Sequence, residues 1–391
     1  MDIDIYLEPS KITPEDLFLH DKRERLGHFI YPHTSEKGIP SLDGISLALV
    51  GVHEGRKSMG NNGCTAAPDA IRTSLYSLFP PVAKPMIADL GNIRRGNSVE
   101  DTWFAVTEVA SYLLRKGIIP IILGGSQDIT WAVYKAYEKI GQVINILSID
   151  NMFDLGDTES ELNSETWLGK VITSQPNYLF NYTNIGYQTY FTDSEAIALM
   201  DKLYFDVCRL GVARTKMSET EPLLRNADMI SFDISSVRFS DACGNANATP
   251  NGFFADEVCQ MARYAGLSEK LSTIGFYEMN PEYDRQGQTA MVIAQMIWFF
   301  IDGFFNRKNE YPYKEKDQFK KYYVSIKDNT HEIIFYKSPK SDRWWMEIPS
   351  ARNADEKIKR HFIVPCSYTD YQTALEDEVP DRWWQFYKKL V

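Results

Sequence analysis

Short apolar runs alternate along most of this chain with longer stretches in which apolar residues recur every three or four positions. Such alternation is typical of a parallel β-sheet whose strands are joined by helices that cover both faces. The sequence therefore predicts an α/β protein with a three-layer α/β/α fold and a mainly parallel sheet. The predicted strands are residues 45–52, 117–123, 143–149, 180–185, 206–210, 229–232 and 273–277, and the predicted helices are 68–78, 99–116, 128–140, 192–203, 255–265 and 288–306.

The pattern changes after about residue 307, where a charged stretch begins. Two runs of alternating polar and apolar residues follow, at 322–327 and 332–337, and Asp-Asn-Thr-His separates them, which predicts a β-hairpin. We expect three parts in the chain. They are an N-terminal segment of residues 1–44, an α/β domain of residues 45–306, and a C-terminal extension of residues 307–391 that carries the hairpin and packs on the core.

The extension contains the tetrapeptide Asp-Arg-Trp-Trp twice, at 342–345 and 381–384, and so holds half of the eight tryptophans. Two copies are too few to define a repeat architecture. Tryptophan is frequent at protein interfaces, but large aromatic side chains more often bury against their own protein. Burial within the chain is the structure we expect, and a protein partner that contacts the extension is the alternative.

Composition and charge narrow the class of protein. The 391 residues are 44% hydrophobic, enough to bury a large core, and the formal charge of −11 argues against nucleic acid or an anionic membrane as partner. The longest apolar run, 291–301, contains Gln295 and is too short to cross a bilayer comfortably. The N-terminus is acidic where an export signal would be basic and then apolar, and the five cysteines lack paired spacing. Both features predict a cytoplasmic protein.

Acidic side chains follow several of the predicted strands. Asp150 and Asp154 end one strand with Met152 between them, Asp233 ends another, and Glu278 follows a third. Each acid taken alone is better explained by a turn or a helix cap than by a metal or ligand site. However, the carboxyl ends of neighbouring parallel strands meet at one edge of a sheet, where ligands usually bind. The set therefore predicts a ligand or metal site at this edge.

Three short motifs, by their order and spacing, resemble those of the ureohydrolase family, which includes arginase, agmatinase and formimidoylglutamase. They are Gly-Gly-Ser-Gln-Asp at 124–128, Asp-Asn-Met-Phe-Asp at 150–154 and Ser-Phe-Asp-Ile-Ser at 231–235. The resemblance spans roughly residues 45 to 306 and implies an arginase-like fold and a homo-oligomer. It also implies that a pair of manganese ions activates water and that Glu278 holds the amidinium or guanidinium group of the substrate.

The sequence departs from the family at the metal ligands. The resemblance places two histidines and four aspartates at positions that are here occupied by Gln127, Asp150, Met152, Asp154, Asp233 and Ser235. No histidine occurs anywhere between residues 54 and 330, so the core of the domain supplies no imidazole. A thioether such as that of Met152 is also a poor ligand for manganese or magnesium.

Several cofactor states are compatible with this set of side chains. They are no metal, one divalent cation (Mg²⁺, Ca²⁺ or Mn²⁺) bound by the three aspartates, or two manganese ions if the protein is an active hydrolase. Asp128 and Asp157 are further candidates for the pocket. Without a metal the aspartates repel one another, and one of them is expected to hold a proton. Arg238, three residues after Ser235, is predicted to supply part of the missing positive charge by pairing with one of the three aspartates.

Two functions follow from these observations. The missing histidines favour a catalytically impaired ureohydrolase-fold protein, a pseudoenzyme, that binds a small guanidino or amidine ligand or a protein partner. The alternative is an active metal-dependent hydrolase of a linear amidine or guanidino compound with a remodelled site. Release of urea or formamide from arginine, agmatine or formiminoglutamate would favour the second.

Overall fold

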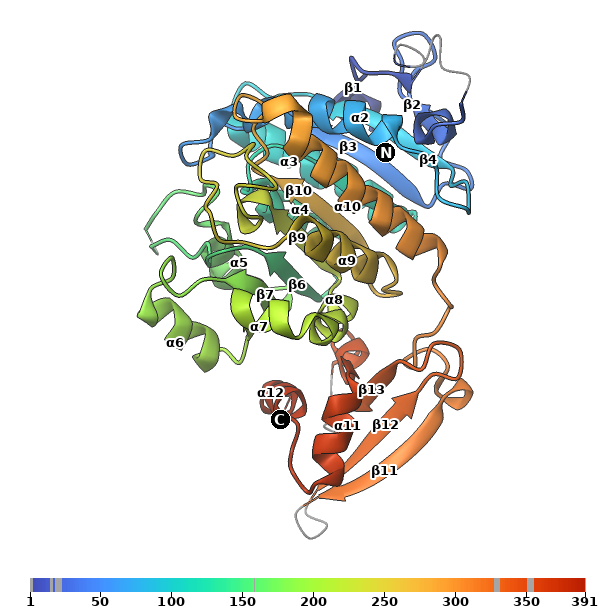
Figure 1. The fold of residues 1–391 in the computed structure, drawn as a ribbon, viewed down its shortest axis with the longest axis vertical. Helices are drawn as coiled ribbons and strands as arrows, with labels where there is room; N and C mark the ends of the chain where they lie inside the picture. The colour runs from blue at the N-terminus through green and yellow to red at the C-terminus, as the bar shows by residue number, and fades with distance from the viewer. Residues whose placement is uncertain are drawn as a thin grey trace.

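The computed structural model describes residues 3–390 except 15–16, 18–22, 158, 327–330 and 350–354. In these residues a large sheet with helices on both faces forms the body of the molecule, and a smaller antiparallel sheet lies beside it near the C-terminus (Figure 1). The strand order of the large sheet is β1-β4-β3-β5-β10-β9-β6-β7-β8, with β2 paired to β4. Only the β1–β4 pair is antiparallel among the pairs of this sheet. The predicted α/β/α fold is therefore confirmed.

Each predicted strand and helix of the body is present close to its predicted range, and β1, β2, β4, α5, α7 and α8 are additional. The strands are β1 (Leu7–Glu8), β2 (Ile30–Pro32), β3 (Leu47–Val52), β4 (Ile87–Ile93), β5 (Ile119–Leu123), β6 (Ile144–Ile149), β7 (Leu179–Tyr187), β8 (Asp206–Arg209), β9 (Met229–Asp233) and β10 (Thr273–Tyr277). The helices are α2 (Ala67–Ser77), α3 (Val99–Arg115), α4 (Ile129–Ile140), α5 (Trp167–Thr173), α6 (Ser194–Lys202), α7 (Leu210–Thr215), α8 (Thr220–Asn226), α9 (Ala255–Gly266) and α10 (Gln288–Phe305).

Strand β4 is the main element that the sequence did not predict. Its sequence, Ile-Ala-Asp-Leu-Gly-Asn-Ile, lacks a continuous apolar run, yet every residue in it is buried. Arg72, which is completely buried, makes this burial favourable because its guanidinium donates to both carboxylate oxygens of Asp89 and to Oδ1 of Asn92. A buried polar group is tolerated when it is paired. From the sequence alone Arg72 is a candidate for binding an anionic ligand, although an arginine is more often solvated or paired, and in the structure it pairs with Asp89.

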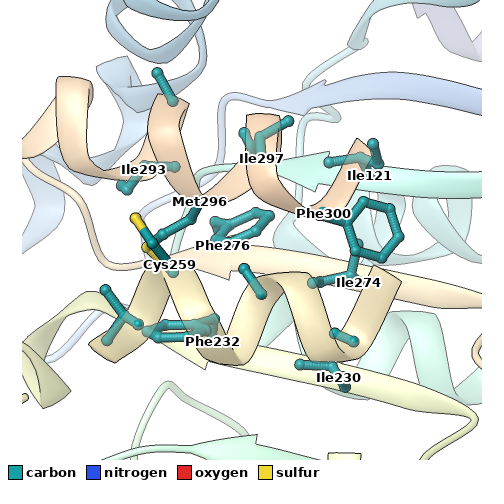
Figure 2. Packing of buried hydrophobic residues seen from close by; sticks show 14 of the residues in the cluster. Ile121, Ile230, Phe232, Cys259, Ile274, Phe276, Ile293, Met296, Ile297 and Phe300 are labelled. Carbon is teal, nitrogen blue, oxygen red and sulfur yellow. The ribbon is translucent and has the colours of Figure 1, made fainter. Parts of the chain in front are cut away.

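Two apolar clusters lie on the two faces of the large sheet. Because side chains alternate along a strand, Leu47 and Leu49 of β3 join one cluster with α2, α8, α9 and α10, whereas Ala48 and Val50 join the other with α3, α4 and α5. Figure 2 shows part of the first cluster, in which Ile297 and Phe300 of α10 lie near side chains of the central strands. Burial on both faces explains why the central strands are apolar throughout.

Helix α10 contains the apolar run noted in the sequence. A 21-residue segment, Arg285–Phe305, is long and apolar enough to cross a membrane by length and composition, and it is the one such helix in the part of the chain that the structure describes. Over half of its most apolar window, 56%, is buried inside the protein. Its buried residues pack in the first cluster against α9 and α2. This packing is that of a core helix.

The C-terminal part forms an antiparallel sheet covered by two helices. Its strands, in the order β11-β12-β13-β14, are β11 (Lys320–Ile326), β12 (His331–Lys337), β13 (Trp344–Glu347) and β14 (Ile363–Cys366), and its helices are α11 (Tyr368–Leu375) and α12 (Asp381–Leu390). The predicted hairpin is β11 with β12, while its turn lies outside the described residues. Trp344, Trp345 and Trp383 are buried, and Trp384 is 41% exposed. The tryptophan pairs therefore serve mainly to build this small core.

The small sheet contacts the body at the amino ends of the large sheet's strands. Arg360 pairs with Asp228, just before β9, over 2.5 Å, and the His361 ring stacks on Phe180 of β7 with 4.3 Å between ring centroids. Arg225 of α8 donates to the carbonyl oxygens of Trp344 and Cys366 over 3.1 and 3.3 Å. The acidic side chains singled out in the sequence lie at the opposite, carboxyl ends of the strands. The C-terminal part therefore does not cover them.

Candidate functional site

The central strands bring the predicted acidic residues to one edge of the sheet. Strands β5, β10, β9 and β6 are neighbours in this order and run parallel, so the residues that follow them are adjacent. Gly124 and Gly125 after β5 have φ of +71° and +79°, a conformation that glycine adopts without strain. Their turn leads Gln127 to the site at the start of α4.

These residues surround a cavity of about 290 Å³. Its lining contains both acidic and amide side chains. The lining residues are Asp150, Asn151, Met152, Asp154, Ser164, Glu165, Phe191, Asp233, Ser235, Asn245, Asn247, Thr249 and Glu278. Six of the residues predicted from the sequence are thus brought together: Asp150, Met152, Asp154, Asp233, Ser235 and Glu278.

Two amide N–H groups hold the carboxylate of Asp150, at a position where the resemblance implies a metal ligand. Its Oδ2 accepts a hydrogen bond from the Gln127 side chain over 3.1 Å, and its Oδ1 accepts one from the backbone N–H of Met152 over 3.3 Å. Gln127 also donates to Oγ of Ser231 over 3.3 Å. Gln127 is buried behind the cavity and is not one of its lining residues. Both oxygens of this carboxylate therefore have protein donors.

The other two aspartates are also held by protein donors. The indole N–H of Trp167 donates to Oδ2 of Asp154 over 2.6 Å, and both residues are buried. The backbone N–H of Ser235 donates to Oδ1 of Asp233 over 2.6 Å, which caps the short turn of 3₁₀ helix that begins at residue 234. The charges of Asp150 and Asp154 also repel each other, which favours a proton on one of the two carboxyls.

Burial dominates the electrostatics of the site. Burial raises the pKa of Asp150 to about 6 and that of Glu278 to about 8. Burial, and next the charge of Asp150, raise the pKa values of Asp154 and Asp233 well above the ordinary range. Within the described residues no lysine, arginine or histidine pairs with any of these four carboxyls. Among the residues that the structure describes, no positive charge therefore compensates these carboxyls.

Glu278 occupies a strained backbone conformation that its neighbours fix. Its φ is +64°, which is unusual for a residue other than glycine. The side-chain amides of Asn61 and Asn245 each donate to its carbonyl oxygen over 2.8 Å. Its carboxylate accepts from Ser58 Oγ over 2.6 Å and from the backbone N–H of Gln127 over 2.9 Å. Strain of this kind persists only where the surroundings over-determine it, and it is frequent at functional sites.

Three predicted pocket residues lie elsewhere. Arg238 pairs with Asp241 over 2.8 Å and stacks on Phe254 at 3.8 Å from the ring centroid, so the predicted pairing with the site aspartates is wrong. An acid close in sequence and an aromatic ring both contact this guanidinium and hold it away from the site aspartates. Asp128 is buried against Trp103 and Ser126 and does not line the cavity. Asp157 lines a second, neighbouring cavity.

The donor set does not fit a pair of manganese ions. Two of the positions that match family ligands hold Met152 and Gln127, and the amide of Gln127 presents an N–H to Asp150. In the described residues no group of three or more His, Cys, Asp or Glu side chains is placed to hold a metal ion. One divalent cation bound by Asp150, Asp154 and Asp233 was one of the cofactor states compatible with the sequence, and the described residues are not grouped in this way.

A mainly parallel sheet flanked by helices, with an acidic cavity at its carboxyl edge, defines a three-layer α/β protein. The Arginase family model matches residues 45–301, most of this architecture. The chain belongs to the arginase family.

Relatives and solved structures share this fold. The formimidoylglutamases of Staphylococcus aureus (strain bovine RF122 / ET3-1) and Staphylococcus haemolyticus are both 25% identical to this chain, over 66% and 68% of it and 86% and 88% of their own lengths. The structure of Trypanosoma cruzi formiminoglutamase with manganese has a TM-score of 0.62 at 18% identity, covering 68% of this chain and 96% of that one. The formimidoylglutamase from Bacillus subtilis also has a TM-score of 0.62, at 20% identity, covering 68% and 88%.

Several residues of the site were not predicted from the sequence. Asn151, Asn245 and Asn247 line the cavity, while Ser58 and Asn61 hold Glu278 from a loop that precedes α2. The asparagine-rich loop after β9 is a signal that could have found two of these residues. Ser58 and Asn61 lie over 200 residues from Glu278, and no local pattern indicates that contact.

Proposed function

We propose that the cavity binds a small cationic ligand that carries an amidinium or guanidinium group. The observation that supports this most directly is a set of four buried carboxyls that no cationic side chain among the described residues pairs with: Asp150, Asp154, Asp233 and Glu278. Buried charges are normally paired, and unpaired carboxyls instead retain protons. A planar cation with several N–H donors would compensate this charge and use the free acceptor positions.

Glu278 is the group we assign to the amidinium. Its carboxylate is held rigidly by Ser58, Asn61 and the Gln127 backbone, so it is preorganised to accept hydrogen bonds from a ligand. Asn151 adds an acceptor because its Oδ1 is buried without a hydrogen-bond partner. Both a pseudoenzyme and an active enzyme would bind the ligand in this cavity.

Hydrolysis of the bound amidine is the second candidate function. Kinship with formimidoylglutamases over more than four fifths of their length favours it. The reaction would add water to the amidine carbon, break one C–N bond, and release an amine and formamide from a formimidoyl compound. A pKa of about 6 places Asp150 in the range where a carboxylate can accept a proton from water. The changed donor set favours binding without turnover, and an assay must separate the two.

Calorimetric titration and a product assay test both functions. The chain is titrated with acetamidine, agmatine, arginine and N-formimidoyl-L-glutamate, and urea, formamide and ammonia are measured after long incubation, with and without manganese. We expect at least one amidine or guanidine to bind, and Glu278→Gln to weaken that binding at least tenfold, because the amide cannot lose a proton to pair with the bound cation. Glu282→Gln, at an exposed glutamate four residues away, is the matched control. Binding without product would support the pseudoenzyme, product release would support the hydrolase, and no binding of any compound would overturn the proposal.

A further inference from the structure

The outer strand of the small sheet, β11, is exposed along one edge. Within the described residues it pairs with β12 alone, and it lies at the side of the sheet away from the body (Figure 1). Alternate residues of an antiparallel edge strand direct their N–H and C=O groups away from their own sheet. Such a row of unpaired backbone groups is a template for a further strand, so β11 can extend the sheet.

The opposite edge of the same sheet, strand β14, is closed to such pairing. It contains Pro365, which has no N–H to donate. Arg225 donates to the carbonyl oxygen of Cys366 over 3.3 Å, and Arg382 donates to that of Pro365 over 3.2 Å. Strand β11 contains no proline, and its residues 322–326 carry no charge. Strand β11 is therefore the edge that remains available.

A groove of about 560 Å³ lies between β11 and helix α11. It is lined by residues 321–325 of the strand together with Tyr371, Ala374, Leu375 and Asp377. Leu375 is 58% exposed, and Tyr323, on the face of the strand away from the helix, is 62% exposed. Because the side chains of a strand alternate between its two faces, a strand added here would cover both residues. The groove therefore fits an extended segment with an apolar middle.

Helix α11 runs in the same direction as β11. Tyr368, the first residue of the helix, contacts the ring of Trp344, which lies at the level of Lys320 in the sheet. Tyr371, about one turn later, contacts the ring of Tyr322, two residues further along the strand. The carboxyl ends of the helix and of the strand are therefore neighbours (Figure 1).

The two ends of the groove carry opposite charges. Lys320 and Lys321 begin the strand, and three exposed acids, residues 376–378, follow the helix at the other end. A second copy of β11 in the antiparallel direction would bring its lysines to these acids. With a two-fold axis at Tyr323, Lys320 of one copy lies opposite Ile326 of the other, and no lysine faces another lysine. The groove is thus complementary in charge to a second copy of itself.

We propose that two copies of this chain pair antiparallel through β11, about a two-fold axis at Tyr323, and join their small sheets into one continuous sheet. The same surface of each copy forms the contact, so this assembly closes at two chains. The surface lies outside residues 45–301, which the family model matches, and it shares no lining residue with the candidate site. The inference is therefore independent of the proposed function.

Crosslinking tests the position of the two-fold axis. Residues directly opposite each other on antiparallel strands have Cα atoms about 4.5–5.5 Å apart, within the range of a disulfide. The full-length Tyr323→Cys protein, oxidised with oxidised glutathione, should therefore run as a covalent dimer on a non-reducing gel. Ser325→Cys, exposed on the same face of the strand, is the matched control, because the two copies of residue 325 would lie about 13 Å apart. The unmodified chain, with its own five cysteines, gives the background.

A charge exchange tests the complementarity of the two ends. Lys320→Glu places like charges together in the paired copies, and we expect it to weaken the dimer at least tenfold in sedimentation velocity. Adding Asp377→Lys to this variant reverses both ends of the groove and should restore most of the affinity. Lys308→Glu, at an exposed lysine outside the groove, is the control and should leave the dimer unchanged.

Three results would overturn the inference. A monomer at every concentration would mean that β11 pairs with a different protein or with none. Equal crosslinking of the Tyr323→Cys and Ser325→Cys proteins would mean that the strands do not meet in this register. An assembly that Lys320→Glu leaves intact would be held by another surface. If a charge variant fails to fold, the comparison of the two cysteine variants remains decisive.

Discussion

The side-chain amide of Gln127 donates a hydrogen bond to Oδ2 of Asp150, so a position where the resemblance implies a metal ligand presents an N–H to this carboxylate. We therefore expect weak manganese binding. In 1 mM manganese, after dialysis against a chelator, the free energy of unfolding should rise by less than about 0.5 kcal/mol, as for a dissociation constant near or above 1 mM. Urea unfolding with manganese, and with magnesium as the ionic control, measures this. Two manganese ions retained per chain after dialysis, detected by plasma mass spectrometry, would show that the site rearranges to bind them.

The sequence predicted those parts of the fold and of the site whose pattern is local in the chain, and it missed those that depend on contacts between distant residues. The central strands and long helices were predicted because their apolar residues recur at a clear period, and the acids at the strand ends followed from parallel topology. Strand β4 was missed because a tertiary partner, Arg72, buries its polar residues. Arg238 was misplaced because sequence proximity to Ser235 does not show which way a side chain points. It contacts Asp241 and Phe254 instead.

Trp167 should support the site through its contact with Asp154. Trp167→Phe keeps most of the buried aromatic surface but removes the indole donor, which leaves Oδ2 of Asp154 without that partner in a buried place. We expect the free energy of unfolding to fall by about 1–3 kcal/mol, the usual effect of an unpaired buried acceptor. Urea denaturation followed by circular dichroism measures it. Trp131→Phe, at a partly exposed tryptophan, is the control, and equal effects of the two changes would indicate lost packing rather than a lost hydrogen bond.

Arg225 should hold the C-terminal part to the body. Its guanidinium donates to the carbonyl oxygens of Trp344 and Cys366, pairs with Glu221 and lies 4.3 Å from the ring centroid of Trp345. Arg225→Ala removes all these contacts and leaves the carbonyls unpaired, so we expect a loss of about 3 kcal/mol or more in unfolding free energy.

The control for Arg225→Ala is a change at Arg263, whose side chain is 40% exposed and pairs with Asp302 at the surface. Arg263→Ala should cost less than about 1 kcal/mol, because exposed ion pairs contribute little. Limited proteolysis should also cleave the Arg225→Ala protein faster, near residues 306–319, between the two sheets. Equal stability and equal cleavage of the two variants would mean that other contacts hold the parts together.

Lys270 should make stability depend on pH. It lies buried near Asp228 and His361, and burial lowers the pKa of its ammonium from 10.5 to about 7 despite the nearby charge of Asp228. Between pH 7 and about 10.5 the unfolded chain therefore binds more protons than the folded chain, and stability rises with pH in this window. Burial holds the pKa of the neighbouring His361 well below its ordinary value, so its own window lies at acidic pH.

Lys270→Met isolates this effect because it removes the titrating group and keeps an aliphatic side chain of similar length. From pH 7 to pH 9 the unmodified chain should gain about 2 kcal/mol relative to the variant, as linkage gives for one group with this shift. Urea unfolding at pH 7, 8 and 9 measures the difference, and Lys216→Met, at an exposed lysine, is the control that should track the unmodified protein. Parallel pH curves for all three proteins would show that Lys270 stays protonated in the folded chain. Its attraction to Asp228 would then outweigh the cost of burial, and the interface between the two sheets would be held by a permanent charge pair.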